Sequence, residues 1–234
     1  MAGKYKLSQL LSRMGYGSRR EVEGLVYSGR ITLGGAEIDD AAMVITAEDH
    51  AALRVDGEVA DPLPGMVVML HKPLGVTCSH KEMGALVYDL FPARWRRREP
   101  QLSTIGRLDK ETSGLLLLTD DGALLHKIIS PKQHIAKQYR ATLARPLQGH
   151  EAALFASGTL MLEGEEKPLL PAELEVVSAQ EALLTLNEGR YHQVRRMFAA
   201  AGNHVEALHR ASRGQLRVLG IALDRDADAL AAQI

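Results

Sequence analysis

Residues 106–119 read Gly-Arg-Leu-Asp-Lys-Glu-Thr-Ser-Gly-Leu-Leu-Leu-Leu-Thr, and this stretch decides much of the fold. The four leucines at 115–118 form a continuous apolar run, which is typical of a strand buried on both faces. The nine residues before them combine two glycines, two cations, two acids and two hydroxyl side chains. A polar loop that leads into a buried strand is held rigidly and can present a reactive side chain.

Asp109 is the candidate reactive group of this loop. Arg107 and Lys110 flank it, so its carboxylate would be kept ionised and could act as a nucleophile or a base. The alternative is an ordinary surface ion pair, which is the commoner role of an arbitrary loop aspartate.

The sequence around the loop predicts a larger sheet with helices. Apolar and alternating patterns predict strands at 66–70, 115–118, 139–143, 174–177 and 183–186. Helices are expected at 122–129, 150–157 and 192–201. Because strands and helices do not alternate strictly, we expect an α+β fold with a mixed, mainly antiparallel sheet and flanking helices.

The first 60 residues predict a small α/β unit of their own. Apolar side chains follow helical spacing at Leu7, Leu10, Leu11 and Met14. Ser18 and Glu21 form a capping box that would begin a second helix, and the Gly34-Gly35 turn joins two short strands over 31–38. A proline- and glycine-rich linker at 61–65 would separate this domain, 1–60, from a second one at 66–234.

Composition excludes several classes of protein. The 234 residues are 46% hydrophobic and 24% charged, which gives enough apolar side chains for a core and argues against disorder. The single cysteine, Cys78, excludes an internal disulfide framework and a multi-cysteine zinc site. There is no apolar leader or run of ~20 apolar residues, so we expect a soluble cytoplasmic protein without a membrane association.

The net charge of −1 conceals basic and acidic segments. Residues 1–35 carry six Lys or Arg against two acids, and residues 190–217 carry six against one. Residues 36–66 carry eight acids against one arginine. The basic segments are candidate phosphate contacts, and solvated faces paired with nearby acids are an equally good interpretation.

Three further segments could carry function. Residues 188–197 read Glu-Gly-Arg-Tyr-His-Gln-Val-Arg-Arg-Met, and a helix beginning near His192 would project Arg195 toward a carboxylate in a cleft or into solvent. Lys137 and Tyr139 share one side of a strand, where a tyrosine is usually a core residue. The run Arg94-Trp95-Arg96-Arg97-Arg98 suits either RNA or a solvated loop.

Motifs for cofactors are missing from the sequence. There is no phosphate loop and no dinucleotide fingerprint, and the nine histidines show no ligand spacing. We therefore expect no metal, nucleotide or redox cofactor.

Four separated motifs occur in a characteristic order and spacing. They are Lys72-Pro73-x-Gly75-x-x-x-Ser79, the run from Gly106 to Gly122 around Asp109, Lys137-x-Tyr139, and Gly189-Arg190-Tyr191-His192-Gln193-Val194-Arg195-Arg196-Met197. From about residue 66 to its end, the chain resembles the pseudouridine synthases that modify ribosomal RNA. The N-terminal unit, with Gly17-Ser18-Arg19-Arg20 and Gly29-Arg30-Ile31-Thr32-Leu33, resembles the S4 RNA-binding domain that commonly precedes them.

The resemblance implies a fold and a reaction. It implies the pseudouridine synthase fold and an isomerisation in which the N1–C1′ bond of a uridine breaks, the uracil turns, and C5 joins C1′. Asp109 would be the essential carboxylate, Tyr139 would stack on the flipped uracil, and Arg195 would form an ion pair with Asp109. A flipped nucleotide costs a few kcal/mol of stacking, which phosphate contacts must offset. The expected RNA contacts are Arg107, Arg19, Arg20, Arg30, Lys72, Lys137, Arg190 and Arg196, of which Lys72 and Lys137 would frame the cleft.

The target RNA follows from finer features of the resemblance. Lys167-Pro168, Pro171-Ala172-x-Leu174-Glu175 and Gly202-Asn203-His204 are most similar to the small-subunit enzyme, a 16S rRNA pseudouridine(516) synthase. The partner would be 16S RNA in a partly assembled subunit, bound by a monomer. The alternatives are a synthase that acts on 23S RNA and a non-catalytic RNA-binding assembly protein. A glycoside hydrolase would need two carboxylates across a sugar, and Glu111 is the only acid close to Asp109.

Overall fold

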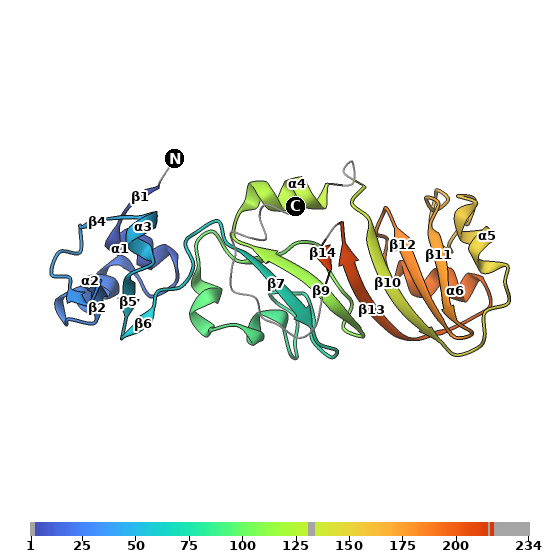
Figure 1. The fold of residues 1–234 in the computed structure, drawn as a ribbon, viewed down its shortest axis with the longest axis horizontal. Helices are drawn as coiled ribbons and strands as arrows, with labels where there is room; N and C mark the ends of the chain where they lie inside the picture. Colours follow the sequence, from blue (N-terminus) through green and yellow to red (C-terminus); the bar gives the residue numbers. More distant parts are fainter. Residues whose placement is uncertain (1–2, 131–133, 215, 218–234) are drawn as a thin grey trace. The chain divides into compact units, whose positions relative to one another are not determined.

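The computed structural model describes residues 3–130, 134–214 and 216–217. The chain divides into two compact units (Figure 1). The first comprises Met1–Val67, Tyr88–Ser103 and Leu118–Leu124, and the second comprises Val68–Val87, Thr104–Leu117 and Leu125–Ile234. The segments Tyr88–Ser103 and Leu118–Leu124 therefore pack with the N-terminal residues, although they come later in the sequence.

The first unit is a small α/β assembly whose helices pack on short strands. Its elements before residue 67 are β1 (Lys4–Lys6), α1 (Leu7–Arg13), α2 (Arg19–Tyr27), β2 (Ile31–Leu33), β3 (Ala36–Glu37), β4 (Val44–Thr46), α3 (Ala47–His50), β5 (Leu53–Val55) and β6 (Glu58–Val59). The predicted apolar stripe of α1 is fully buried and packs with Val22 and Val26 of α2. The strands form a four-stranded sheet in the order β3-β2-β5-β6, and β1 pairs with β4.

The predicted capping box at the start of α2 is confirmed. The backbone N–H of Ser18 donates to the Glu21 carboxylate at 2.7 Å, and the N–H of Glu21 donates to the Ser18 hydroxyl at 3.3 Å. This reciprocal pair satisfies two N–H groups that a helix start would otherwise leave free. It also leaves Arg19 and Arg20 exposed on the first turn.

Residues 61–65 are fixed by arginines from the 94–98 run. Arg94 forms two hydrogen bonds to the Asp61 carboxylate, at 2.5 and 2.8 Å. Arg98 pairs with Asp120 at 2.8 Å with both side chains almost completely buried, and the same carboxylate accepts the N–H of Gly65. The arginine run begins in a 3-10 helix, η2 (Ala93–Arg97), which follows η1 (Val87–Leu90). Arg94 and Arg98 therefore form ion pairs within the protein. The sequence alone suggests RNA contact or a solvated loop for this run.

The second unit is built on the expected mixed sheet. Its strand order is β11-β12-β10-β13-β9-β7, with β14 paired to β13 and β8 paired to β9. The strands are β7 (Val67–Lys72), β8 (Ser103–Thr104), β9 (Thr112–Thr119), β10 (Lys137–Leu143), β11 (Glu173–Ser178), β12 (Glu181–Leu186), β13 (Val205–Arg213) and β14 (Leu216–Arg217). The helices are α4 (Gly122–Ile129), α5 (Glu151–Ala156) and α6 (Gln193–Ala200). β13 runs antiparallel to β10 and parallel to β9.

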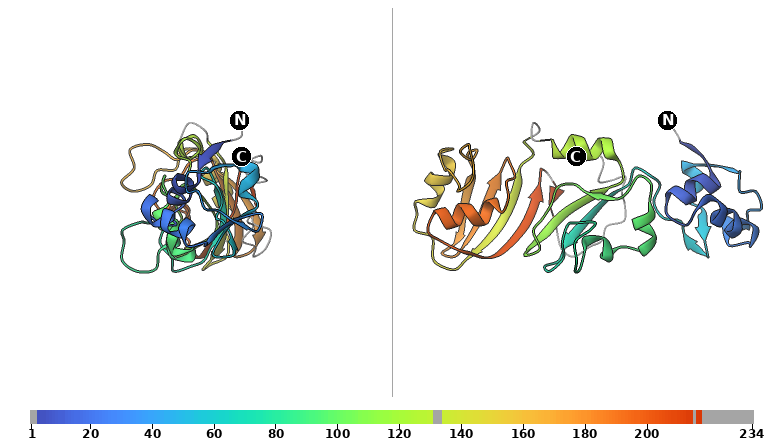
Figure 2. Two further views of the ribbon diagram at one scale, coloured as in Figure 1. Left: turned by 90° about the vertical axis from the view of Figure 1, so that its left-hand side faces the viewer. Right: turned by 180° about the vertical axis from the view of Figure 1, so that it is seen from behind.

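Two helices cover one face of this sheet. Phe155 of α5 and Phe198 of α6 meet edge to face with ring centroids 5.2 Å apart. They share one apolar core with side chains of β10, β12 and β13. Figures 1 and 2 show the two helices beside the strands of this part of the sheet. Because the apolar face of α6 is buried in this core, the position of the first residues of the helix is fixed relative to the sheet. Among the described residues, no helix has the length and apolar character needed to cross a membrane.

Candidate active site

Asp109 lies in a loop whose backbone is held at consecutive residues. The N–H of Thr112 donates to the Asp109 carbonyl at 3.0 Å, which closes a tight turn just before β9. The N–H of Gly75 donates to the Lys110 carbonyl at 2.9 Å. The sequence therefore places the carboxylate on a short, braced loop at the beginning of a buried strand, as the apolar run at 115–118 predicts.

Lys72 stabilises the same loop through hydrogen bonds to its backbone. Its side chain is fully buried, and its ammonium donates to the carbonyls of Pro73 and Thr112 at 2.9 Å and of Lys110 at 3.4 Å. Burial lowers the pKa of Lys72, and the nearby carboxylates of Asp109 and Glu111 oppose this shift. The expected RNA contact of Lys72 is therefore wrong, because its charge is used inside the protein to hold the loop.

Arg195 reaches the loop as well, but through the backbone. Its guanidinium donates to the Glu111 carbonyl at 2.8 Å and to the Val205 carbonyl at 2.6 Å. The expected ion pair between Arg195 and Asp109 is not formed in the described part of the chain. Arg195 instead ties α6 to the Asp109 loop and to the start of β13, and so it positions the carboxylate indirectly.

Two buried arginines of β13 lie beside the loop, and sequence reasoning missed both. Arg210 is 1% exposed and donates to the carbonyl of Leu115 at 2.6 Å and of Arg107 at 3.4 Å. Arg213 donates to the Ile105 carbonyl at 3.1 Å. Burial, followed by the charge of Arg210, lowers the pKa of Arg213 to about 10. Local sequence provides no signal for them, because arginines are mostly exposed and the burial of these two depends on strands distant in the sequence.

The close approach of β9 and β13 depends on Gly114. Its φ is +109°, and a Cβ placed there would lie 2.3 Å from the carbonyl oxygen of Arg210. Gly114 stands opposite Arg210 in the parallel ladder. A side chain at 114 would therefore separate the strand that follows Asp109 from the strand that carries the two arginines.

Asp109 and Tyr139 line one groove of about 750 Å³, which is a usual size for a small-ligand site. The cations of its lining are Arg107, Lys137, Arg190, Arg210 and Arg213. Tyr139 lies opposite Arg210 in the antiparallel ladder of β10 and β13. The structure thus brings Asp109 and Tyr139 to the same groove, and Arg195 supports it from the loop backbone.

Lys137 frames this groove as expected. Its ammonium donates to the Glu188 carbonyl at 3.1 Å. Burial lowers the pKa of Lys137 to about 8, and the charges of Arg213 and Arg210 add to the shift. Lys137 is therefore a cation whose charge changes just above neutral pH at the border of the site.

His192 is the direct partner of the carboxylate. Its Nε2 lies 3.4 Å from Oδ1 of Asp109, and both side chains are a little over one-third exposed. The neighbouring Tyr191 stacks on His192, with ring centroids 3.9 Å apart and an angle of 16° between the planes. Both residues belong to the motif at residues 189–197, and the resemblance assigned them no role.

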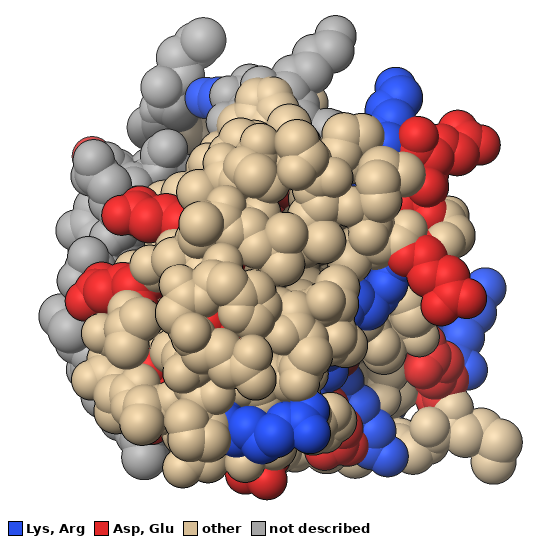
Figure 3. Space-filling view, turned by 90° about the vertical axis from the view of Figure 1, so that its right-hand side faces the viewer, with Lys and Arg blue, Asp and Glu red and all other residues tan. Residues whose placement is uncertain are grey.

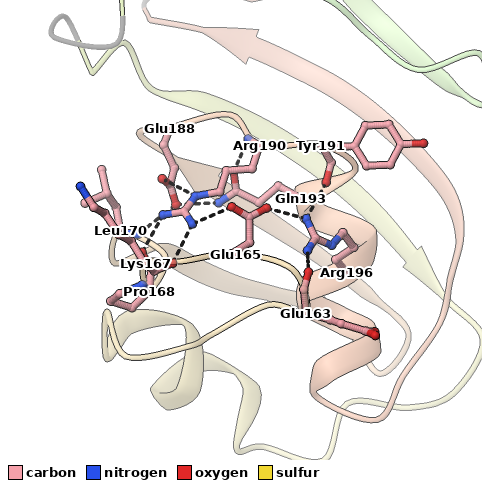
Figure 4. A network of polar contacts seen from close by, with 10 residues as sticks. All are labelled: Glu163, Glu165, Lys167, Pro168, Leu170, Glu188, Arg190, Tyr191, Gln193 and Arg196. Carbon is pink, nitrogen blue, oxygen red and sulfur yellow. Dashed lines mark hydrogen bonds and ion pairs between the residues drawn. The ribbon is translucent and has the colours of Figure 1, made fainter.

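Arg190 and Arg196 are held in a polar network, shown in Figure 4. Arg190 binds the carboxylates of Glu188 and Glu165 at 3.1 Å and the carbonyls of Lys167 and Pro168 at 2.7 and 2.6 Å. Arg196 binds the other oxygen of Glu165 at 2.8 Å and the carbonyl of Glu163. Both side chains keep part of their surface exposed, 19% for Arg190 and 25% for Arg196, so their RNA contacts remain predictions.

The remaining predicted RNA contacts are accessible. The Arg107 side chain is 70% exposed, with the Glu82 carboxylate 4.0 Å away. Arg30 forms an exposed ion pair with Asp56 at 2.6 Å. Arg19 and Arg20 are exposed on α2. The face seen in Figure 3 is mostly uncharged, with acidic and basic side chains toward its border.

Within the described ranges, no three His, Cys, Asp or Glu side chains gather so that they could hold a metal ion.

Comparison with known proteins agrees with this geometry. Residues 66–200 match the RNA pseudouridylate synthase family. "Ribosomal small subunit pseudouridine synthase A" of Escherichia coli (strain K12) is 40% identical over 211 residues, which cover 88% of this chain and 84% of that protein. The protein of the same name from Pasteurella multocida (strain Pm70) is 39% identical over 206 residues, covering 86% and 85%. A crystal structure of a pseudouridylate synthase superposes with a TM-score of 0.61 at 35% identity, covering 90% of this chain and 89% of that one. The chain therefore belongs to the RNA pseudouridylate synthase family.

Proposed function

We propose that this chain converts one uridine of small-subunit (16S) ribosomal RNA to pseudouridine. The single observation that carries the proposal is the carboxylate of Asp109 on a braced loop, in a groove that it shares with Tyr139 and several cations. The names of the relatives support the small subunit as the source of the RNA.

The chemistry assigns each group a task at the target nucleotide. The N1–C1′ bond breaks, C5 joins C1′, C5 loses its proton to solvent and N1 gains one, so no other reactant is needed. Asp109 assists the departure of the base at C1′, either by attack or by stabilising positive charge there. Tyr139 stacks on the flipped uracil, and Arg107, exposed at the groove, supports the flipped geometry.

The first 60 residues supply a second contact with RNA in this proposal. They form an S4-like RNA-binding domain. Residues 61–65 connect this domain to the catalytic domain, which comprises residues 66–234. Arg19 and Arg20 support this assignment because the capping box leaves them exposed on the first turn of α2. Such contacts to phosphates weaken as salt rises. The substrate in this proposal is RNA in a partly assembled small subunit, bound by one copy of the chain.

Mapping pseudouridines in ribosomal RNA tests the proposal. RNA from cells that have the chain and from cells that lack it is compared at every uridine. We expect one 16S pseudouridine, at position 516, to disappear without the chain and to return when the gene is restored. Loss of a 23S pseudouridine instead would favour the large-subunit alternative, and an unchanged map would favour a non-catalytic assembly protein.

A further inference from the structure

Tyr191 is an exposed aromatic side chain at the border of the groove that contains Asp109. Its side chain is among the most exposed large hydrophobic groups of the described residues, at 75%. Tyr191 is among the residues that line this groove, so its exposed ring is accessible to a ligand bound there.

The ring of Tyr191 is held in place by its neighbour. It stacks on the imidazole of His192 at 3.9 Å, and Nε2 of that imidazole lies 3.4 Å from Asp109. One face of Tyr191 is thus covered by a ring that is itself tied to the catalytic loop. The exposure of the tyrosine leaves the other side open to a flat partner.

The backbone under the two rings is fixed in an uncommon conformation. His192 has φ 48° and ψ 33°, the left-handed region that residues other than glycine seldom adopt. Its carbonyl accepts the N–H of Arg196, and the Tyr191 carbonyl accepts the Arg196 guanidinium at 3.2 Å. A strained residue that is held from several sides often belongs to a functional site.

We propose that Tyr191 stacks on the base of the nucleotide next to the target uridine. This inference rests on the proposed function and adds a contact to it. When the target leaves the RNA stack to reach Asp109, its neighbour loses a stacking partner. A ring at the border of the groove replaces that partner, and stacking tolerates any base because each has a flat face.

The test compares Tyr191→Ala and Tyr191→Phe with wild type on small-subunit RNA that wild type modifies. Initial rates of tritium release from 5-tritiated uridine give kcat and KM separately. We expect Tyr191→Ala to raise KM about tenfold, equal to ~1.4 kcal/mol, while Tyr191→Phe restores it. Val176→Ala, a similarly exposed apolar side chain on β11, is the control and leaves both constants unchanged.

An altered RNA identifies the contact itself. Substrates lacking the base on either side of the target are compared with both enzymes. We expect one of the two abasic RNAs to raise KM about tenfold with wild type and to add no further loss with Tyr191→Ala, because both changes remove the same contact. Full additivity of the two losses, or a loss confined to kcat, would overturn the proposal. A wild-type enzyme that releases no tritium would instead contradict the proposed function.

Discussion

The guanidinium of Arg195 donates a 2.8 Å hydrogen bond to the carbonyl of Glu111, two residues beyond Asp109. The same guanidinium holds the Val205 carbonyl at the start of β13. Arg195 therefore joins α6, β13 and the Asp109 loop without contacting the Asp109 carboxylate. In the proposed mechanism, Arg195 would act on catalysis through the position of the loop backbone.

Replacing Arg195 by Gln should lower kcat by about 10- to 100-fold and leave KM within about threefold. A displacement of a reacting group by about 1 Å is enough for a loss of this size. Steady-state tritium release measures both constants. Arg195→Lys should recover only part of kcat, because one ammonium cannot reproduce the planar two-carbonyl contact. Full recovery by Lys would instead indicate that a positive charge beside Asp109 is all that is required.

The pH dependence of KM for RNA should show the titration of Lys137. Because its pKa is lowered to about 8, its charge is lost as pH rises from about 7 to 9, and KM for RNA should rise over that range. Lys137→Met should have a higher KM at pH 7 that stays constant to pH 9, at fixed ionic strength. A rise in KM that persists in Lys137→Met would assign the titration to another group.

The same pKa shift has a consequence for stability. Between about pH 8 and the ordinary lysine value, the unfolded chain keeps a proton that the folded protein has released, so the contribution of Lys137 to folding becomes more favourable as pH rises. Urea unfolding of wild type and Lys137→Met across this range checks the sign.

Gly114→Ala should destabilise the second unit by about 3 kcal/mol or more. The new Cβ adds a clash with the Arg210 backbone to the cost of a left-handed φ. Gly149→Ala is the matched control, since Gly149 has φ +93° but no atoms near its Cβ position, and it should lose only about 1–2 kcal/mol. Equal losses in urea unfolding would show that close strand approach is unimportant.

Asp120→Asn should destabilise the first unit by about 3–5 kcal/mol, because it leaves the buried guanidinium of Arg98 without a counter-charge. Asp56→Asn breaks the exposed pair with Arg30 and serves as the control. Its effect on the unfolding midpoint should be within error. A similar loss in both variants would mean that burial does not decide the strength of these pairs.

Local patterns in the sequence predicted much of the fold. The apolar stripe of α1, the Ser18–Glu21 capping box and the leucines of β9 depend on neighbours within a few residues. The strand β13 was not predicted, because its alternation is interrupted by His209, Arg210 and Arg213, whose burial depends on strands distant in the sequence.

The site was predicted only in part, because some of its contacts join segments that are distant in the sequence. Motif resemblance selected Asp109 and Tyr139, and the structure places both in one groove. It did not predict that Lys72 is buried or that Arg190 and Arg196 share Glu165, since both facts depend on chain segments meeting in space. The pairing of Asp109 with His192 likewise requires the fold of α6 against the loop.

The most direct test of the central claim is tritium release from 5-tritiated uridine in small-subunit RNA by Asp109→Asn, with Glu111→Gln as the control for a neighbouring exposed acid. We predict that Asp109→Asn loses turnover by at least about a thousandfold while its unfolding midpoint and RNA affinity stay close to those of wild type. Glu111→Gln should keep most of its activity. Release by Asp109→Asn near the wild-type rate would contradict the assignment of the reaction to this carboxylate.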